Sequence, residues 1–227
     1  MREEKRTFRL FMAGWAPLFI AGAVTAWQGD KLAVHAAMNT FHTPALDAFF
    51  TYFTHLADGL VPTALSFVLL FAKSWRAFLM MGLSCGLSAL AAQSLKHGPY
   101  SHLDRPSMFR DQLAGMPWVE GIDLHSHFSF PSGHTTAAFS MCLALAVVLG
   151  RTRLALPLVL LATMLGYARI YLSQHFLQDV VVGSLFGVGF GALMYHILHR
   201  SHWSAAEWLN KRPFLKGGSG APQRSPS

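Results

Sequence analysis

The sequence predicts an all-α, polytopic membrane protein with six transmembrane helices in a bundle. Hydrophobic residues make up 52% of its 227 residues and charged residues 13%, a balance that is unusual for a water-soluble domain. Six apolar stretches reach or approach the roughly 20 helical residues that a bilayer crossing requires. These stretches lie at residues 8–27, 56–72, 77–95, 135–150, 154–172 and 180–198.

The first stretch follows a cluster of basic residues, so a cleaved signal peptide is the competing interpretation. However, the apolar run is longer than the central region of about 7–15 residues that signal peptides have. Residues 27–30 also lack a small-residue cleavage site. We therefore expect an uncleaved N-terminal helix.

Three segments lie outside the six stretches. Residues 30–55 mix aromatic and polar side chains, which predicts either a helical segment along the membrane interface or a connecting helical hairpin. Residues 96–130 form a long polar loop, and loops of this length usually carry function. We expect an active-site loop at about 96–134 within a membrane domain of residues 1–199. Residues 200–227 predict a cytoplasmic amphipathic segment followed by a disordered tail.

The distribution of Lys and Arg predicts the orientation, because cytoplasmic loops carry an excess of both residues. In the six-helix topology, 13 of the 18 lie on the side of the two termini. The remaining five are Lys31, Lys96, Arg105, Arg110 and Arg169. We therefore expect cytoplasmic termini and an extracytoplasmic polar loop. This topology explains the net charge of +7 without a nucleic acid partner.

Small residues in the apolar stretches predict close packing between the helices. Cys85 and Cys142 are expected to be buried free thiols, with no disulfide framework or zinc site. Gly183, Gly187 and Gly191 recur every four residues in the last stretch, which predicts close contact with another helix.

Three motifs open onto the outer side of this topology, and the first contains Arg169, His175 and Asp179. If the stretch is helical, His175 and Asp179 share a face one turn apart. The carboxylate would then fix the imidazole tautomer and leave the other nitrogen free to attack phosphorus. The alternative is a satisfied polar pair without a chemical role.

The second motif is Pro131-Ser132-Gly133-His134, at the start of the fourth stretch. A helix N-terminus there can bind phosphate through its free amides, which Gly133 leaves open to close approach. Ser132 adds a hydroxyl donor, and His134 could protonate a leaving oxygen. Ser132 is also a good helix cap, and both roles can hold at once.

The third motif supplies Lys96 and Arg105. A guanidinium group matches two phosphate oxygens, whereas an ammonium group acts as a point charge. The alternatives are a snorkelling lysine at a helix end and a surface charge in a loop. His125 and His127, with Asp123 nearby, suggest a metal site only weakly, because such sites need three or four ligands.

Together the motifs resemble those of the type 2 phosphatidic acid phosphatase superfamily, which includes membrane lipid phosphatases, soluble acid phosphatases and haloperoxidases. The family pattern has a Lys and Arg-Pro element, a Pro-Ser-Gly-His element, and a Ser-Arg element followed by His and Asp. Residues 131–134 match the second element fully, and the spacing of Arg169, His175 and Asp179 matches the third. The resemblance covers about residues 56–198.

Two positions depart from the family pattern. Eight residues separate Lys96 from Arg105, where the family usually has fewer. Ala168 stands where the family usually has Ser, which removes one possible phosphate donor.

The resemblance implies a metal-independent phosphatase without a cofactor. It makes His175 the nucleophile that forms a phosphohistidine, Asp179 its orienting group, and His134 the group that protonates the departing oxygen and then activates water. The phosphoryl oxygens would be stabilised by Lys96, Arg105, Ser132, Gly133 and Arg169.

The leading hypothesis is therefore a phosphatase for a phosphorylated lipid, integral to a bacterial inner membrane, with an extracytoplasmic active site. A phosphotransferase using the same intermediate is the first alternative. A non-catalytic lipid-binding or transport protein is the second. Candidate substrates by resemblance are polyprenyl diphosphate, phosphatidylglycerol phosphate, phosphatidic acid and lipid A. The sequence predicts no particular oligomeric state.

Overall fold

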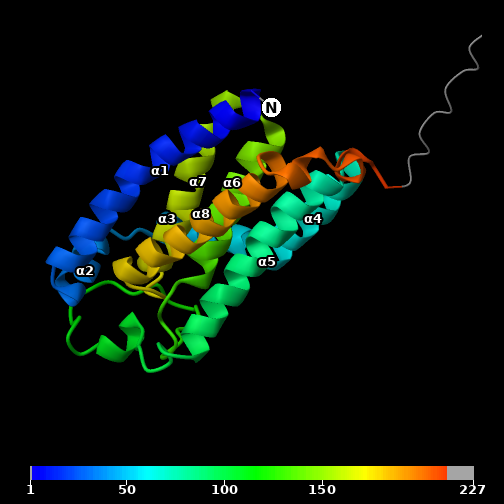
Figure 1. Cartoon of the computed structure of the whole chain (residues 1–227). Helices are drawn as coiled ribbons and strands as arrows, with labels where there is room; N and C mark the ends of the chain where they lie inside the picture. The colour runs from blue at the N-terminus through cyan, green and yellow to red at the C-terminus, as the bar shows by residue number, and fades with distance from the viewer. Residues whose placement is uncertain (1, 214–227) are drawn as a thin grey trace, which may run out of the picture.

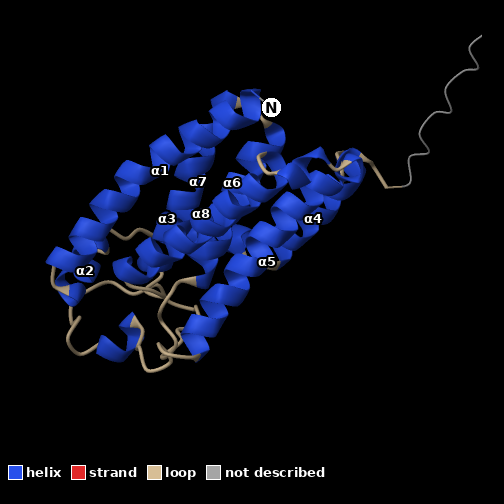
Figure 2. Ribbon diagram, in the orientation of Figure 1, coloured by secondary structure: helices blue, strands red, loops and turns tan. Residues whose placement is uncertain are grey.

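The computed structural model describes residues 2–213, and all regular structure in this range is helical (Figure 2). Six principal helices correspond to the six apolar stretches, which confirms the all-α class. They are α1 (Arg2–Gln28), α4 (Leu60–Ala72), α5 (Trp75–His97), α6 (Gly133–Leu149), α7 (Ala155–Tyr171) and α8 (Leu177–His199).

The segment between α1 and α4 contains two short helices, α2 (Lys31–Met38) and α3 (Pro44–Phe53). Asp30 caps α2 by accepting a hydrogen bond of 2.8 Å from the amide of Ala33. Thr43 caps α3 in the same way, at 3.2 Å from the amide of Leu46. The segment is therefore a pair of helices, and its location along a membrane interface remains a prediction. Single turns of 3-10 helix occur at η1 (Thr54–Ala57), η2 (Pro106–Phe109), η3 (Thr152–Leu154), η4 (His202–Ala205) and η5 (Glu207–Asn210).

Four helical segments are long and apolar enough to cross a membrane: α1, α5, Thr152–Tyr171 and α8. Pro44–Ala57 and Leu60–Ala72 pass the same test only as a pair bent by 50°. Helix α6 is apolar but has only 17 residues. The chain is therefore an integral membrane protein with four to five candidate spans by length and composition, fewer than the six expected.

Helix α6 lies at the centre of the bundle, where it packs against α1, α5, α7 and α8 (Figure 1). Its residues Leu143, Ala144 and Val147 are fully buried. Cys142 on α6 and Cys85 on α5 are buried free thiols, as the sequence predicted. The surrounding helices therefore fix the axis of α6, and with it the position of the helix N-terminus.

The glycines of α8 allow that helix to touch α6 closely, which confirms the packing predicted from their spacing. A Cβ atom added at Gly187 would lie 2.5 Å from the carbonyl oxygen of Thr136, and one added at Gly183 would lie 2.7 Å from that of Ser132. At Gly191 the nearest atom belongs to the side chain of Leu143, at 2.8 Å. The α8 backbone thus rests directly on the first turns of α6.

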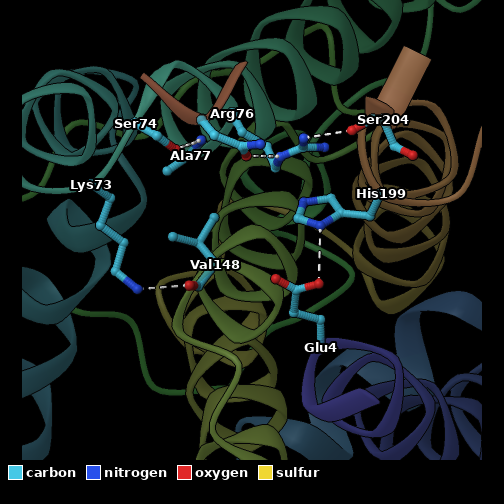
Figure 3. A pocket seen from close by; sticks show the side chains of 9 residues that line it. Glu4, Lys73, Ser74, Arg76, Ala77, Val148, His199 and Ser204 are labelled. Atoms are coloured by element: carbon cyan, nitrogen blue, oxygen red, sulfur yellow. Dashed lines mark hydrogen bonds and ion pairs between the residues drawn. The ribbon is translucent and has the colours of Figure 1, made fainter. Parts of the chain in front are cut away.

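The end of the bundle that contains the N-terminus gathers several of the turns that the charge distribution assigned to one side (Figure 3). The Glu4 carboxylate lies 3.4 Å from Nδ1 of His199, and Lys73 Nζ donates to the carbonyl of Val148 at 2.9 Å. These residues and Arg76 line a cavity of about 380 Å³. The grouping of these turns at one end is confirmed, and their membrane side remains a prediction.

Beyond α8, the chain packs against the start of α5. Arg76 donates to the carbonyl of Ser204 at 2.7 Å and to Oδ1 of Asn210 at 3.1 Å, and Leu209 is buried. The tail expected to be disordered lies outside the described residues.

The α6–α8 contact predicts a difference between two glycines of one helix. Gly187→Ala forces the added methyl group against the backbone of α6, and overpacking of this kind costs about 1–3 kcal/mol. Gly189→Ala places its methyl group where no atom lies within 4 Å, and alanine is the better helix former. Thermal unfolding in detergent should show a lower midpoint for Gly187→Ala and an unchanged or higher midpoint for Gly189→Ala. Equal midpoints would contradict the close packing.

Candidate active site

Segments that are distant in sequence meet at the bundle end opposite the cavity of Figure 3. They are the end of α5, the loop of residues 98–131, the start of α6, and the connection between α7 and α8. The amide of Ser132 donates to the carbonyl of Asp179 at 3.0 Å, which joins the start of α6 to the start of α8. Arg105 Nη1 donates to the carbonyl of Gln174 at 3.2 Å, which joins the loop to the α7–α8 connection.

His175 and Asp179 lie together, but not on one helical face. Helix α8 begins at Leu177, so the turn into the helix brings the pair together, and the expected helical spacing was wrong. His175 Nδ1 lies 3.5 Å from Asp179 Oδ2 and has no hydrogen-bond partner among residues 2–213. The carboxylate instead accepts from Ser129 Oγ at 2.5 Å and from the amide of Phe176 at 2.9 Å. These two bonds hold the Asp179 carboxylate beside the Nδ1 edge of the imidazole.

The surroundings of His175 favour its neutral form. The side chain is 2% exposed, and burial lowers the pKa of His175 well below its ordinary value. The positive charges of Arg105, Arg169 and Lys96 lower this pKa further. At neutral pH the imidazole therefore keeps a lone pair, which a nucleophile needs.

The start of α6 has the features expected of an anion site. Ser132 caps the helix by accepting from the amide of Thr135 at 3.4 Å, so the capping role is confirmed. A Cβ atom added at Gly133 would meet nothing within 4 Å, so its backbone borders open space. The first amides of a helix have no acceptor within that helix. This turn can therefore donate hydrogen bonds to an anion that approaches Gly133.

His134, in the first turn of α6, is held by a carboxylate. Its Nε2 lies 2.7 Å from Oδ1 of Asp58, which stands between η1 and α4. His134 also lies within electrostatic range of Arg169, Lys96 and His175. The two histidines expected from the sequence therefore share one charged environment.

Arg169 enters the same environment from α7. It is 7% exposed, and its Nη1 donates to Thr54 Oγ1 at 2.9 Å. Its Nε is buried without a hydrogen-bond partner among residues 2–213. The guanidinium group therefore retains donor capacity beyond its one bond to η1. Ala168 beside it is fully buried, and packs with Tyr171 and Leu172.

Lys96 and Arg105 come together despite their unusual spacing. Both side chains are buried, and both line a cavity of about 590 Å³ between α5 and the loop. Arg105 is anchored by the carbonyl of His127 at 2.9 Å and by Gln174 Oε1 at 3.0 Å. The loop therefore accommodates the longer spacing between Lys96 and Arg105, and both cations still lie at this end of the bundle.

The residues considered for metal binding do not form a cluster. His127 Nδ1 lies 2.7 Å from Asp104, and the carbonyl of Asp123 accepts from Gln174 Nε2 at 2.7 Å. No group of three His, Cys, Asp or Glu side chains placed to hold a metal occurs in the part of the chain that the structure describes.

Sequence reasoning missed four residues of this region: Thr54, Asp58, Ser129 and Gln174. Thr54 and Asp58 precede the motifs by tens of residues, and Ser129 lies in the irregular loop. Gln174 alone was signalled, by its position next to His175.

Comparison with known proteins identifies the family of this chain. The family model described as the PAP2 superfamily matches residues 75–203. A lipid A 4'-phosphatase of Bacteroides thetaiotaomicron is 26% identical over 190 residues, which cover 82% of this chain and 83% of the relative. A lipid A 1-phosphatase of Rhizobium johnstonii is 37% identical over 90 residues, which cover 39% of this chain and 35% of that protein.

Solved structures show the same fold. The crystal structure of LpxE from Aquifex aeolicus aligns with a TM-score of 0.62 at 30% identity, over 72% of this chain and 93% of that one. A PAP2-type phosphatidylglycerolphosphate phosphatase from Bacillus subtilis aligns with a TM-score of 0.59 at 23% identity, over 87% of this chain and 96% of that one, and this likeness concerns the fold alone. The chain therefore belongs to the PAP2 superfamily, in its branch of membrane lipid phosphatases.

Proposed function

We propose that the protein hydrolyses a phosphate monoester of a membrane lipid through a phosphohistidine on His175, without a metal ion. The observation that carries this proposal is the placement of His175. It is buried beside Asp179 and within electrostatic range of three cations and His134. A neutral imidazole held among cations suits attack on a phosphorus atom that carries negatively charged oxygens.

The proposed first step transfers the phosphoryl group to the enzyme. The Nε2 lone pair of His175 forms a bond to phosphorus while the bond from phosphorus to the lipid oxygen breaks. The electron pair of that bond stays on the lipid oxygen, which takes a proton from protonated His134. Asp179, next to Nδ1, balances the positive charge that develops on the imidazole of His175.

In the second step water attacks the phosphohistidine. Neutral His134 accepts a proton from the water, the new bond from oxygen to phosphorus forms, and the bond to Nε2 of His175 breaks. Inorganic phosphate leaves, and both histidines return to their starting protonation states. In both steps Lys96, Arg105 and Arg169 stabilise charge on the phosphoryl oxygens, with Ser132 and the amide of Gly133 as further donors.

Lipid A is the substrate that we propose. The relatives of Bacteroides thetaiotaomicron and Rhizobium johnstonii are named as phosphatases of this lipid, one for its 4'-phosphate and one for its 1-phosphate. The phosphate in either position is a monoester on a sugar, and its leaving group is an alkoxide that needs a proton. His134 meets that requirement.

The membrane placement that we propose has six spans, with α4 as the second, α6 as the fourth, and α2 and α3 along the outer interface. At 1.5 Å per residue the 17 residues of α6 extend about 26 Å, close to the roughly 30 Å hydrocarbon core. Both termini then face the cytoplasm, and the active site faces outward in a bacterial inner membrane. The bundle end that contains the N-terminus and the cavity of Figure 3 would lie on the cytoplasmic side.

Substitution of His175 tests the function. Purified protein in detergent with EDTA should convert lipid A to a species lighter by one phosphate, as seen by mass spectrometry. His175→Asn should reduce phosphate release to background, because asparagine cannot form the phosphoramidate. Fragmentation of the product assigns the lost phosphate to the 1 or 4' position. Release of phosphate from phosphatidylglycerol phosphate but not from lipid A would be consistent with the mechanism and would exclude lipid A as the substrate.

The chain offers a matched control for this substitution. His199, at the opposite end, is also buried and has its Nδ1 3.4 Å from the Glu4 carboxylate, against 3.5 Å for His175 and Asp179. His199→Asn should therefore carry a similar cost in stability while phosphate release persists. Full activity in His175→Asn would exclude the proposed nucleophile.

Substitution of Gly133 tests whether the start of α6 binds phosphate or is only the beginning of a helix. Gly133→Ala adds a methyl group in open space, so the unfolding midpoint should not fall. A bound phosphoryl group would be displaced from the helix amides, and kcat/KM should fall on the order of 10- to 100-fold. Gly86→Ala on α5, which also meets nothing within 4 Å, is the control that should retain activity. Unchanged kcat/KM in Gly133→Ala would remove the α6 start from the site.

Impermeant thiol labelling of intact cells tests the orientation. Both native cysteines are buried, so the labelling background is low. Ser101→Cys in the exposed loop should react with an impermeant maleimide, whereas Arg151→Cys, exposed in the α6–α7 turn, should react only after lysis. The opposite pattern would invert the proposed topology.

A further inference from the structure

We infer that Asp58 is a positioning residue for His134, which fixes the nitrogen through which His134 exchanges protons with the lipid oxygen and with water. This inference rests on the proposed function, in which His134 is the proton donor and acceptor. It assigns a role to a residue outside the three sequence motifs.

The structure holds the Asp58 carboxylate in place from two sides. Its Oδ1 lies 2.7 Å from Nε2 of His134, and its Oδ2 lies 2.7 Å from Nδ1 of His55. The backbone is fixed as well, because the Asp58 amide donates to the carbonyl of His55 at 3.1 Å and its own carbonyl accepts from the amide of Val61 at 2.9 Å. Asp58 therefore sits at the bend where η1 passes into α4, with one carboxylate oxygen directed at His134.

This contact determines the tautomer of His134. A carboxylate accepts hydrogen bonds, so Nε2 of His134 carries a proton in both the neutral and the charged state. Nδ1 is then the nitrogen that gains and loses a proton during the reaction. In the first step Nδ1–H donates to the lipid oxygen, and in the second step the Nδ1 lone pair accepts a proton from water.

Asp58 also counters the charge around His134. Burial disfavours the protonated form of His134, and the nearby positive charges of Arg169 and Lys96 disfavour it further. Asp58 is the anionic group that the structure places in hydrogen-bond contact with this imidazole. The groups that face Asp58 are His55 from η1, His134 from α6 and Arg169 from α7. Without the Asp58 carboxylate, burial and both cations would oppose the proton on His134, and this contact would no longer offset them.

The segment that carries Asp58 has a second link to the site. Thr54, at the start of η1, accepts from Nη1 of Arg169 at 2.9 Å. A single stretch, Thr54 to Asp58, thus contacts a phosphate-binding cation at one end and the proton-transferring histidine at the other. This arrangement sets the position of His134 relative to Arg169.

The test compares two substrates that differ in their need for a proton. Cleavage of a lipid A phosphate requires protonation of an alkoxide, whereas nitrophenolate leaves from p-nitrophenyl phosphate without it. Asp58→Asn should lower kcat on lipid A on the order of 100-fold, within the range general acid catalysis contributes. The first-turnover burst of nitrophenolate should keep its wild-type rate, because that step needs no proton from His134. The alkaline limb of the pH profile on lipid A should move to lower pH.

A double-substitution cycle separates positioning from structural damage. If Asp58 acts through His134, Asp58→Asn combined with His134→Asn should be no slower on lipid A than His134→Asn alone. Additive losses would overturn the inference. A burst slowed as much as lipid A cleavage would also overturn it, since that pattern indicates general damage to the site.

A matched carboxylate provides the control. Asp104 accepts from Nδ1 of His127 at 2.7 Å, and the exposures of that pair, 36% and 58%, resemble the 37% and 64% of Asp58 and His55. Asp104→Asn should leave the ratio of rates on the two substrates unchanged, and a shift equal to that of Asp58→Asn would contradict a specific role. Failure of the proposed function has a different signature, namely a nitrophenolate burst that survives in His175→Asn.

Discussion

The close contact between α6 and α8 is the constraint on which the site depends. Gly183 and Gly187 let the α8 backbone rest on the carbonyls of Ser132 and Thr136, where a Cβ atom would lie within 2.7 Å of either oxygen. The hydrogen bond from the Ser132 amide to the Asp179 carbonyl completes this contact. His134 lies two residues after Ser132, and His175 lies four residues before Asp179. The glycine stripe of a membrane helix therefore sets the separation of the two histidines, although it lies outside the chemistry itself.

A second constraint is the burial of like charges. Lys96, Arg105 and Arg169 are each less than 10% exposed, and close cations repel one another in a site of low dielectric. The protein holds Arg105 with the carbonyls of His127 and Gln174, and Arg169 with the hydroxyl of Thr54. These partners are neutral, so they orient the cations without cancelling their charge. Such an arrangement favours an anionic ligand, which supports the phosphoryl site proposed above.

The principal helices could be predicted from the sequence because apolar length records them directly, and the local motifs marked residues that the structure brings close together. The number of spans is recorded less directly, since α6 has only 17 residues and α4 passes the length and composition test only together with the bent segment before it. The helical spacing assumed for His175 and Asp179 was wrong, because the helix begins only at Leu177. Asp58 lies 76 positions before His134, and such a contact leaves no local pattern in a single chain. The longer spacing between Lys96 and Arg105 still allows both side chains to line one cavity, since a loop can absorb length that a helix cannot.

The two histidine–carboxylate pairs differ in a way that fits a division of labour. His134 Nε2 and Asp58 Oδ1 are 2.7 Å apart, within hydrogen-bond distance, and the pair is partly exposed. His175 Nδ1 and Asp179 Oδ2 are 3.5 Å apart, and the pair is almost fully buried. A close carboxylate stabilises an imidazolium, which suits a group that must carry a proton during half of the cycle. The Asp179 carboxylate is more distant from its imidazole and already hydrogen-bonded to Ser129, and burial keeps the His175 ring neutral, which suits a nucleophile. The same two residue types thus form two different contacts, a close pair at the proposed proton donor and a buried, more distant pair at the proposed nucleophile.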